Sequence, residues 1–476
     1  MKCHIAFIVL GLTYCAVVSA SVARVDENIW KNLEQATTTN VKITFKKANT
    51  KAAFERFNSL KLTSRNAKLN SQYAILKDHT DVVQADVIFD LKKASAHGKK
   101  HEIAQLWISS ELIVRNVDKE VVEMLSVHPD VASLESEWII QLDNGMVRTS
   151  IPSGNNTISN YQWGVVNVGA PEVWNAGNRG TGAVVGVIDT GARATHVALR
   201  YTYRGNQPGQ NHNYNWYAPT GHDAAPNDNQ GHGTHVIGSA AGTEGIGVAP
   251  GSSWIACRGC ISQGCTNFDL LQCGNWMACP TNTVGAAPDC SKAPNVVNNS
   301  WGGGSNNPWY DAIISAWRNV DIVPIFSSGN AGFTCETLIS PGDRPLAISI
   351  GATLANNQRS GLSSMGPTVD GRINPFIVAP GNEIYSASHM DDTSFISLSG
   401  TSMAAPHVAG VVSLLFSRNP NLNVAQVTAA LRAGAIPHAA VGGSCGGIPD
   451  NIYPNNHVGY GRISAPAAIN SIPQSF

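Results

Sequence analysis

The chain has 476 residues and a formal net charge of −1 at pH 7. This near-neutral balance supplies no positive field to hold nucleic acid or an anionic membrane surface, so the sequence predicts neither partner. The length allows two or three domains with substantial cores.

The first residues have the pattern of a secretory signal. Lys2 precedes an apolar run over residues 5–18, and Val18-Ser19-Ala20 supplies the small residues of a cleavage site. We expect residues 1–20 to be a signal peptide and the protein to be secreted and extracellular. A signal anchor is the alternative, and no later run reaches the ~18 apolar residues of a membrane span.

Charge density divides the remaining chain in two. Residues 21–150 contain 18 Lys/Arg and 17 Asp/Glu, whereas residues 151–476 contain 13 and 16, with Lys292 as the single lysine. A stretch rich in Gly, Pro, Ser and Asn over residues 144–160 has the composition of a linker. We therefore predict one domain over 21–150 and another over 151–476, with the boundary between 140 and 160.

The first domain is predicted to be a small α+β unit. Its patterns indicate strands at residues 41–45, 108–114 and 131–134, a helix at 64–76, and a helix capped by Asp118.

The second domain alternates short β-branched runs with helical patterns. The predicted strands cover residues 183–188, 295–297, 322–326, 347–350 and 377–379, and the predicted helices cover 233–241, 309–318 and 403–416. This alternation favours an α/β fold, in which a parallel sheet is covered by helices on both faces. Active groups should then gather at the carboxyl ends of the strands.

Eight cysteines remain after the two in the signal peptide are removed. They are Cys257, Cys260, Cys265, Cys273, Cys279, Cys290, Cys335 and Cys445. An even number in an exported chain predicts four disulfides. A zinc site is the alternative, because Cys257 and Cys260 have the spacing of metal ligands.

Three motifs together suggest covalent catalysis. Asp189 ends a predicted strand, His232 lies between two glycines at the start of a helix, and Ser402 begins a long helix that is apolar on every side. Each alone has an ordinary explanation, as a turn residue, a surface histidine or a helix cap. Together they supply the orienting acid, the base and the nucleophile of acyl transfer. An aspartic protease would need a second Asp-Thr/Ser-Gly, which the chain lacks.

With these motifs the chain resembles the subtilisin-like serine proteases, over residues 161–463. The order Asp, His, Ser is that of subtilisin itself. The runs at residues 295–303 and 307–310 are most similar to the bacillopeptidase-type branch. The resemblance implies a parallel sheet sandwiched by helices. It also implies that residues 42–143 are a ferredoxin-like propeptide, which would act as intramolecular inhibitor and folding template.

The resemblance also implies further site residues. Asn330 matches the asparagine that donates to the oxyanion. The substrate-binding residues would be Ser300, Trp301, Gly302, Gly303, Ser327, Ser328 and Gly329. The first four resemble an edge strand that pairs with the main chain of an extended peptide. None of the seven carries a charge, so we expect a primary pocket that favours uncharged side chains.

Two features depart from the family pattern. Residues 242–250 are shorter than in subtilisins that carry an inserted calcium loop. We therefore expect no required cofactor and assign no metal ligand, and a structural calcium without a recognisable loop is the alternative. Residues 257–290 are dense in cysteine, and Cys335 is close enough to Asn330 for a disulfide to brace that loop.

The sequence thus predicts a monomeric, secreted serine endopeptidase, made as a zymogen that cuts itself between about residues 140 and 159. A catalytically impaired homologue that acts as a binding module is the alternative, although no triad member is missing. An esterase of the α/β-hydrolase type would need Gly-x-Ser-x-Gly and the order Ser, Asp, His, whereas Ser402 lies in Gly-Thr-Ser-Met-Ala.

Overall fold

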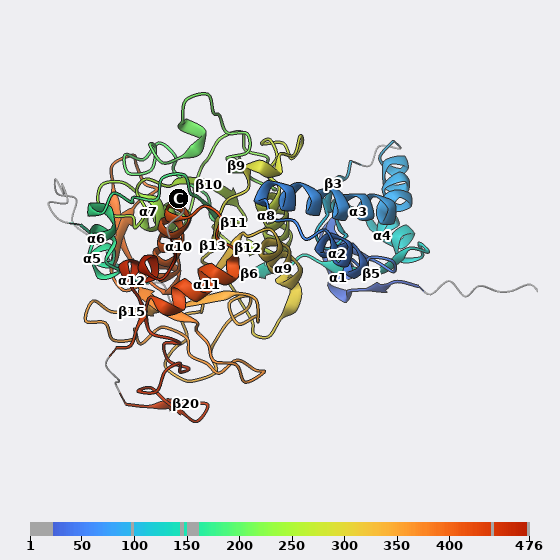
Figure 1. Cartoon of the computed structure of the whole chain (residues 1–476). Coiled ribbons are helices and arrows are strands. Elements are labelled where there is room, and N and C mark those ends of the chain that lie inside the picture. Colours follow the sequence, from blue (N-terminus) through green and yellow to red (C-terminus); the bar gives the residue numbers. More distant parts are fainter. Residues whose placement is uncertain (1–21, 97–99, 143–146, 150–160, 439–441, 474–476) are drawn as a thin grey trace, which may run out of the picture.

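The computed structural model describes residues 22–96, 100–142, 147–149, 161–438 and 442–473. A small N-terminal unit, blue to cyan in Figure 1, lies beside a larger unit formed by the rest of the chain. The predicted signal peptide and most of the predicted linker lie outside the described residues. The predicted division into domains over 21–150 and 151–476 stays a prediction.

The N-terminal unit is built on a five-stranded sheet with the order β1-β5-β2-β4-β3. Its strands are β1 (Arg24–Val25), β2 (Thr39–Phe45), β3 (Glu102–Leu106), β4 (Glu111–Val117) and β5 (Val131–Ser136). Its helices are α1 (Glu27–Gln35), α2 (Lys51–Ser59), α3 (Arg65–Ala96) and α4 (Lys119–Ser126). The β1–β5 pair is parallel and the other pairs are antiparallel. The Asp118 side chain caps α4 as predicted, by accepting from the Val121 N–H.

Two predicted elements of this unit differ from the observed ones. The helix predicted at 64–76 continues to Ala96, because no glycine or proline interrupts the sequence over that length. The strand predicted at 108–114 begins only at Glu111. Residues 107–110 instead form a turn, with Ser110 at φ 58°, that joins β3 to β4 as a hairpin.

The larger unit contains a nine-stranded sheet with the order β19-β22-β16-β15-β14-β13-β8-β10-β9. The strands are β8 (Val184–Asp189), β9 (Trp216–Tyr217), β10 (Ser253–Arg258), β13 (Val296–Asn299), β14 (Val323–Ser327), β15 (Ile348–Thr353), β16 (Ile377–Pro380), β19 (Ala435–Ile436) and β22 (Arg462–Ile463). Every pair is parallel except β19–β22. The predicted α/β fold with a mostly parallel sheet is confirmed.

Helices cover both faces of this sheet. They are α5 (Trp163–Asn167), α6 (Ala170–Asn175), α7 (His232–Ala241), α8 (Asn267–Ala278), α9 (Asp311–Asn319), α10 (Thr401–Arg418), α11 (Val424–Ala433) and α12 (Ala465–Asn470), with 3₁₀ turns at Arg204–Asn206, Cys290–Lys292 and Pro308–Tyr310. Alternate residues of β8 point to opposite faces. Val185 and Val187 therefore join the core around α7 and α10, whereas Ile188 joins the core under α8 and α9.

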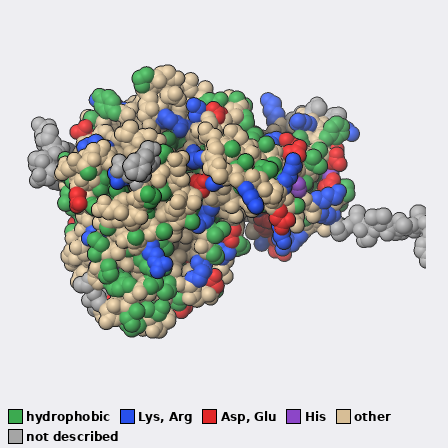
Figure 2. All heavy atoms as spheres, in the orientation of Figure 1, with side chains coloured by type: hydrophobic (Ala, Val, Ile, Leu, Met, Phe, Trp, Pro, Cys, Tyr) green, Lys and Arg blue, Asp and Glu red, His purple; other side chains and the backbone are tan. Residues whose placement is uncertain are grey.

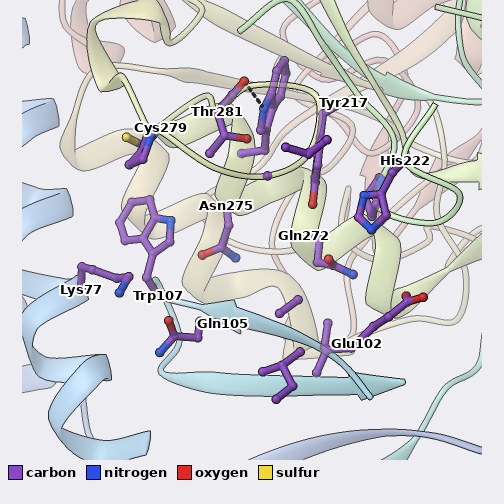
Figure 3. A pocket seen from close by; sticks show the side chains of 18 of the residues that line it. Lys77, Glu102, Gln105, Trp107, Tyr217, His222, Gln272, Asn275, Cys279 and Thr281 are labelled. Carbon is purple, nitrogen blue, oxygen red and sulfur yellow. Dashed lines mark hydrogen bonds between the residues drawn. The ribbon is translucent and has the colours of Figure 1, made fainter. Parts of the chain in front are cut away.

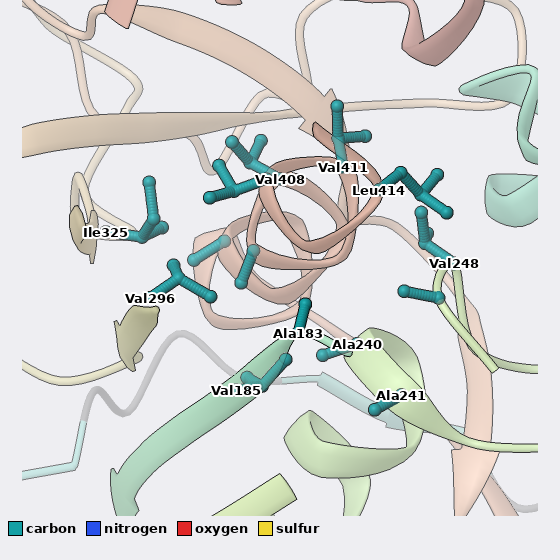
Figure 4. Close-up of a cluster of buried hydrophobic side chains, with 14 of the residues drawn as sticks. Ala183, Val185, Ala240, Ala241, Val248, Val296, Ile325, Val408, Val411 and Leu414 are labelled. Carbon is teal, nitrogen blue, oxygen red and sulfur yellow. The ribbon is translucent and has the colours of Figure 1, made fainter. Parts of the chain in front are cut away.

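Helix α10 is the buried axis of the fold. Figure 4 shows Val408, Val411 and Leu414 of α10 surrounded by apolar side chains from β8, β13, β14 and α7. Thr401 through Phe416 are all buried, as its apolar composition predicts. Among the described residues, no helix has both the length and the apolar composition needed to cross a membrane.

Two histidines buried in this core predict a fall in stability with acidification. Burial lowers the pKa of His235 to about 3 and that of His407 to about 4, whereas an unfolded histidine titrates near 6.5. Because the unfolded chain binds the extra protons, stability is lost as pH falls below about 6.5. At pH 5 each histidine should lower the free energy of unfolding by about 2 kcal/mol. Burial raises the pKa of Asp269 to about 6, so this group binds a proton more readily in the folded state and should raise the free energy of unfolding by about 1 kcal/mol at pH 5.

The thermal midpoint of a proteolytically silent Ser402→Ala variant, measured at pH 7.5 and pH 5, checks this prediction. The midpoint should be lower at pH 5. The same protein between pH 7.5 and 8.5 is the control, since neither histidine titrates there in either state. An equal or higher midpoint at pH 5 would contradict the prediction.

All eight cysteines are paired in the structure. The bridges are Cys257–Cys273, Cys260–Cys265, Cys279–Cys290 and Cys335–Cys445. The prediction of four disulfides is confirmed. The alternative zinc site is wrong, because Cys257 and Cys260 belong to different bridges and offer no thiolates. Cys335 ties the segment after Asn330 to β20 (Ser444–Cys445), which pairs with β21 (Ile448–Pro449).

Two small three-stranded sheets join segments that lie far apart in the sequence. The sheet β11-β12-β6 joins β11 (Cys260–Ile261) and β12 (Gly264–Thr266) to β6 (Ile139–Ile140). The sheet β17-β18-β7 joins β17 (Ile384–Ala387) and β18 (Phe395–Ser399) to β7 (Val147–Thr149). The chain that leaves the N-terminal unit therefore pairs first with β12 and then with β18.

Candidate active site

The side chains of Asp189 and His232 form a buried contact at the carboxyl end of β8. Asp189 is the last residue of β8 and His232 is the first of α7. The Asp189 Oδ1 and His232 Nδ1 atoms are 2.7 Å apart, and the two side chains are 1% and 2% exposed. Because an ionised carboxylate can only accept, the proton of this contact lies on Nδ1. The other ring nitrogen, Nε2, is then the basic one in a neutral imidazole.

Glycine on each side of His232 allows this approach, as the sequence suggested. A Cβ atom on Gly233 would lie 2.2 Å from the Gly191 main-chain oxygen and 3.1 Å from Asp189 Cβ. Gly231 has φ +99°, a left-handed conformation that a side chain would strain. The helix can therefore start close against the end of β8 only with glycine at these two positions.

A second carboxylate, that of Asp228, joins the end of β8 to the start of α7, and it was not predicted from the sequence. Asp228 Oδ1 accepts from the Gly231 N–H at 2.8 Å and from the Thr190 hydroxyl at 3.0 Å. Its Oδ2 accepts from the N–H and hydroxyl of Thr234 at 2.9 and 2.6 Å. Asp228 thus caps α7 and fixes the residue that follows Asp189. The sequence did contain a signal for this role, because Asp228 is an acidic residue a few positions before the start of a predicted helix.

Ser402 lies in the first turn of α10, buried beside the end of β13. Its hydroxyl donates to the Ser300 main-chain oxygen at 3.2 Å, and the Ser300 hydroxyl donates to the Ser402 main-chain oxygen at 2.9 Å. These reciprocal contacts hold the helix start against the segment after β13. The N-terminal position in α10 also gives Ser402 a local positive potential from the helix dipole.

Asn330 lies next to this helix start with its amide held in one orientation. Its Oδ1 accepts from the Thr401 N–H at 2.8 Å and from the Thr401 hydroxyl at 3.0 Å. Because this oxygen accepts both bonds, the NH₂ group lies on the opposite side of the amide. Asn330 therefore presents donors, as an oxyanion-binding group requires.

The other predicted substrate-binding residues follow two neighbouring strands. Ser300, Trp301, Gly302 and Gly303 follow β13, and Ser327, Ser328 and Gly329 lie at the end of β14 or directly after it. β13 and β14 pair in parallel, with Asn299 opposite Phe326. The two sets therefore leave the same edge of the sheet and lie near each other.

Ile339 occupies the space between these two sets and was not predicted. A Cβ atom on Gly302 would lie 2.9 Å from Ile339 Cδ1, and one on Gly329 would lie 3.1 Å from Ile339 Cγ2. An aliphatic side chain therefore fills the gap between the two main-chain walls. No local pattern in the sequence marks Ile339 for this position.

The segment that leaves the N-terminal unit lies along the same region. Ile140 pairs with Cys265 of β12 in antiparallel register. A Cβ atom on Gly303 would lie 3.2 Å from Ile140 Cγ2, so Ile140 also contacts the segment after β13. Further along, β7 pairs with β18, whose last residue, Ser399, precedes Ser402 by three positions. Ile140 thus contacts both β12 and Gly303, and β7 lies beside β18.

A cavity of about 580 Å³ lies elsewhere, between the N-terminal unit and the larger unit. Figure 3 shows Lys77, Gln105 and Trp107 on one wall and Tyr217 and Asn275 on the other. None of Asp189, His232, Ser402 or Asn330 lines it. The cavity is a gap in the contact between the two units and is separate from the candidate active site.

Metal ligands are not gathered in the described part of the chain. Within those ranges no group of three or more His, Cys, Asp or Glu side chains is placed to hold a metal ion. The segment 242–250 runs directly from α7 toward β10.

Comparison with known proteins agrees with this geometry. The sequence profile of the subtilase family, Peptidase S8, matches residues 180–461. The chain is 33% identical to Bacillopeptidase F of Bacillus subtilis over 446 residues, which cover 89% of this chain but only 30% of that protein. It is 33% identical to Thermitase of Thermoactinomyces vulgaris over 266 residues, 55% of this chain and 84% of that one. It is 29% identical to Subtilisin DY of Bacillus licheniformis over 272 residues, 56% and 88% of the two chains. The chain belongs to the subtilase family of serine peptidases.

Proposed function

We propose that this protein is a secreted, monomeric serine endopeptidase that hydrolyses extended peptides through Asp189, His232 and Ser402. The observation that carries the proposal is the buried Asp189–His232 contact of 2.7 Å. It leaves a basic nitrogen on a histidine that α7 holds at the edge of the sheet where α10 begins. Nothing in the triad is missing, so the alternative of an impaired binding module has no supporting observation.

In the proposed reaction, Ser402 Oγ attacks the carbonyl carbon of the peptide bond. Its proton moves to His232 Nε2, and Asp189 stabilises the imidazolium that forms. The charge on the tetrahedral intermediate falls on the former carbonyl oxygen, where the Asn330 amide and the Ser402 N–H donate. Collapse of the intermediate breaks the C–N bond and returns the proton to the leaving amine. Water then hydrolyses the acyl-enzyme by the same steps.

Covalent titration tests this function. An arylsulfonyl fluoride should label the mature protein once, on the peptide that contains Ser402, and abolish hydrolysis of a soluble peptide. A protein that binds peptides but neither hydrolyses them nor takes the label would be the binding module instead.

We infer further that residues 21 to about 150 are an inhibitory propeptide. The unit gathers many of the charged side chains visible in Figure 2. It is attached to the larger unit by the buried ion pair Arg115–Asp269 and the partly buried ion pair Lys68–Asp321, each at 2.6 Å. On either side of residues 143–146, β6 pairs with β12 and β7 pairs with β18, which precedes Ser402. A segment bound in this way would block other peptides and offer its own bonds for cleavage.

The pairings of β6 and β7, one on each side of the proposed cleavage site, narrow the proposed cleavage window. Ile140 is already paired with β12, and Val147 is paired with Ser399 close to Ser402. The bond presented to Ser402 should therefore lie between residues 141 and 147. This window falls inside the range of 140–159 predicted from sequence.

Primary specificity is predicted to favour small, uncharged side chains. Ile339 fills the space between Gly302 and Gly329, and no charged side chain belongs to the predicted pocket set. A buried Lys, Arg, Asp or Glu would be desolvated there without a partner. Ile339→Gly should raise kcat/KM for large apolar residues about tenfold or more, since the cavity gains several methylene groups.

A peptide library with a randomised primary position measures this on both proteins. The matched control is Ile436→Gly, a replacement of an exposed isoleucine in the edge strand β19. A dominant preference of the wild-type protein for Arg or Asp would contradict the prediction, as would an unchanged profile in Ile339→Gly.

A further inference from the structure

An aromatic platform lies beside the segment 138–140, which leaves the N-terminal unit and pairs with β12. Trp309, in the 3₁₀ turn before α9, packs against Tyr310 and Trp301, with ring centroids 4.9 and 6.1 Å away. Trp301 is buried, and its Nε1 donates to the Ile188 main-chain oxygen at 2.9 Å. The platform is therefore fixed to the central sheet, and a ring that binds to it would cause little loss of protein conformational freedom.

Trp138 occupies this platform in the structure. Its ring meets that of Trp309 edge to face, with centroids 5.3 Å apart and planes at 75°. Its main chain is held at two points by Asn267, the first residue of α8. The Trp138 N–H donates to Asn267 Oδ1 at 2.9 Å, and the Trp138 oxygen accepts from the Asn267 N–H at 3.1 Å.

The spacing of the bound segment matches an extended strand. Ile140, two residues after Trp138, pairs with Cys265 and contacts Gly303. Side chains two residues apart in an extended chain point to the same side. Trp138 and Ile140 are thus successive residues on one side of a strand, one against Trp309 and the other against Gly303.

We propose that Trp309 and Asn267 form an upstream subsite that selects an aromatic side chain in peptide substrates, two residues before the residue opposite Cys265. The inference rests on the proposed endopeptidase function. All groups that hold the segment belong to the larger unit, so the subsite persists when residues up to the cleavage window have left. Asn267 binds a main-chain N–H and a main-chain oxygen, which every residue except proline has. The preference for an aromatic ring comes from Trp309 alone.

Partial exposure of Trp138 supports a site that accepts different rings. Trp138 remains 37% exposed while its ring contacts that of Trp309. An enclosed pocket would fit one side chain, whereas an open platform accepts Trp, Tyr or Phe. The gain is limited to one aromatic pair, which corresponds to about twofold to tenfold in kcat/KM.

A positional scan with the mature wild-type enzyme tests the proposal. In a series of soluble peptides with one scissile bond, a single Trp is moved through the upstream positions against an alanine background. One position should raise kcat/KM about twofold to tenfold, and Lys at that position should not. Trp309→Ala should remove the preference and Trp309→Phe should keep part of it. Tyr201→Ala, which removes an exposed ring stacked by Arg200, should keep all of it.

A short peptide without upstream residues separates this proposal from the proposed function. All variants should cleave it at the wild-type rate, and a wild-type protein that fails to cleave it would refute the endopeptidase function instead. A flat wild-type scan would overturn the subsite even if Trp309→Ala does not fold. A preference that survives in folded Trp309→Ala would overturn it as well, and would leave Trp309 as a contact for the N-terminal unit only.

Discussion

Replacing Ser402 with Ala is expected to leave the protein uncut and without peptidase activity. The alanine side chain has no oxygen to attack a carbonyl, so neither acyl transfer nor self-cleavage can begin. The loss in turnover should be about a million-fold, the size carried over from subtilisin. The secreted wild-type protein should begin within residues 142–147, whereas the variant should begin after the signal peptide.

Intact mass and N-terminal sequencing of both secreted proteins, made in a host without extracellular proteases, measure this difference. Ser413→Ala is the matched control, because Ser413 lies on the same buried helix and donates only to the Ala409 oxygen one turn earlier. That control should mature normally. A Ser402→Ala protein that appears cut within the window would refute self-processing, since another protease would then be responsible.

Replacing Asn330 with Ala is expected to slow turnover far more than it weakens substrate binding. The amide meets the substrate oxygen fully only when that oxygen becomes an oxyanion, so its loss appears in kcat and hardly in KM. The expected loss in kcat is about a hundred- to a thousand-fold, a range carried over from subtilisin. The residual activity should still require Ser402.

The Asn330 variant also has a structural cost that must be separated from catalysis. Thr401 loses the acceptor of its N–H and hydroxyl, which should lower stability by about 1–3 kcal/mol. Active-site titration counts the folded enzyme, so kcat per titrated site isolates the chemical effect. Asn421→Ala, at an exposed position after α10, should leave kcat unchanged. An unchanged kcat in Asn330→Ala would remove Asn330 from the site.

Local sequence patterns determined much of the fold. The apolar run at 403–416 predicted a buried helix, and it lies wholly within α10. Short β-branched runs predicted five strands of the parallel sheet. These predictions succeed because the signals for helix caps, for periodicity and for burial on all sides each lie within a few consecutive residues. The order of Asp189, His232 and Ser402 likewise needs no coordinates.

The tertiary structure alone decided which distant residues meet. The even number of cysteines predicted four disulfides, but their pairing follows from packing. Ile339 lies between Gly302 and Gly329 because two neighbouring strands leave the sheet at the same edge. Trp138 and Asn267 are 129 residues apart and meet because β6 pairs with β12. Such contacts depend on how whole elements pack, and packing is a property of the complete chain that no short stretch of sequence encodes.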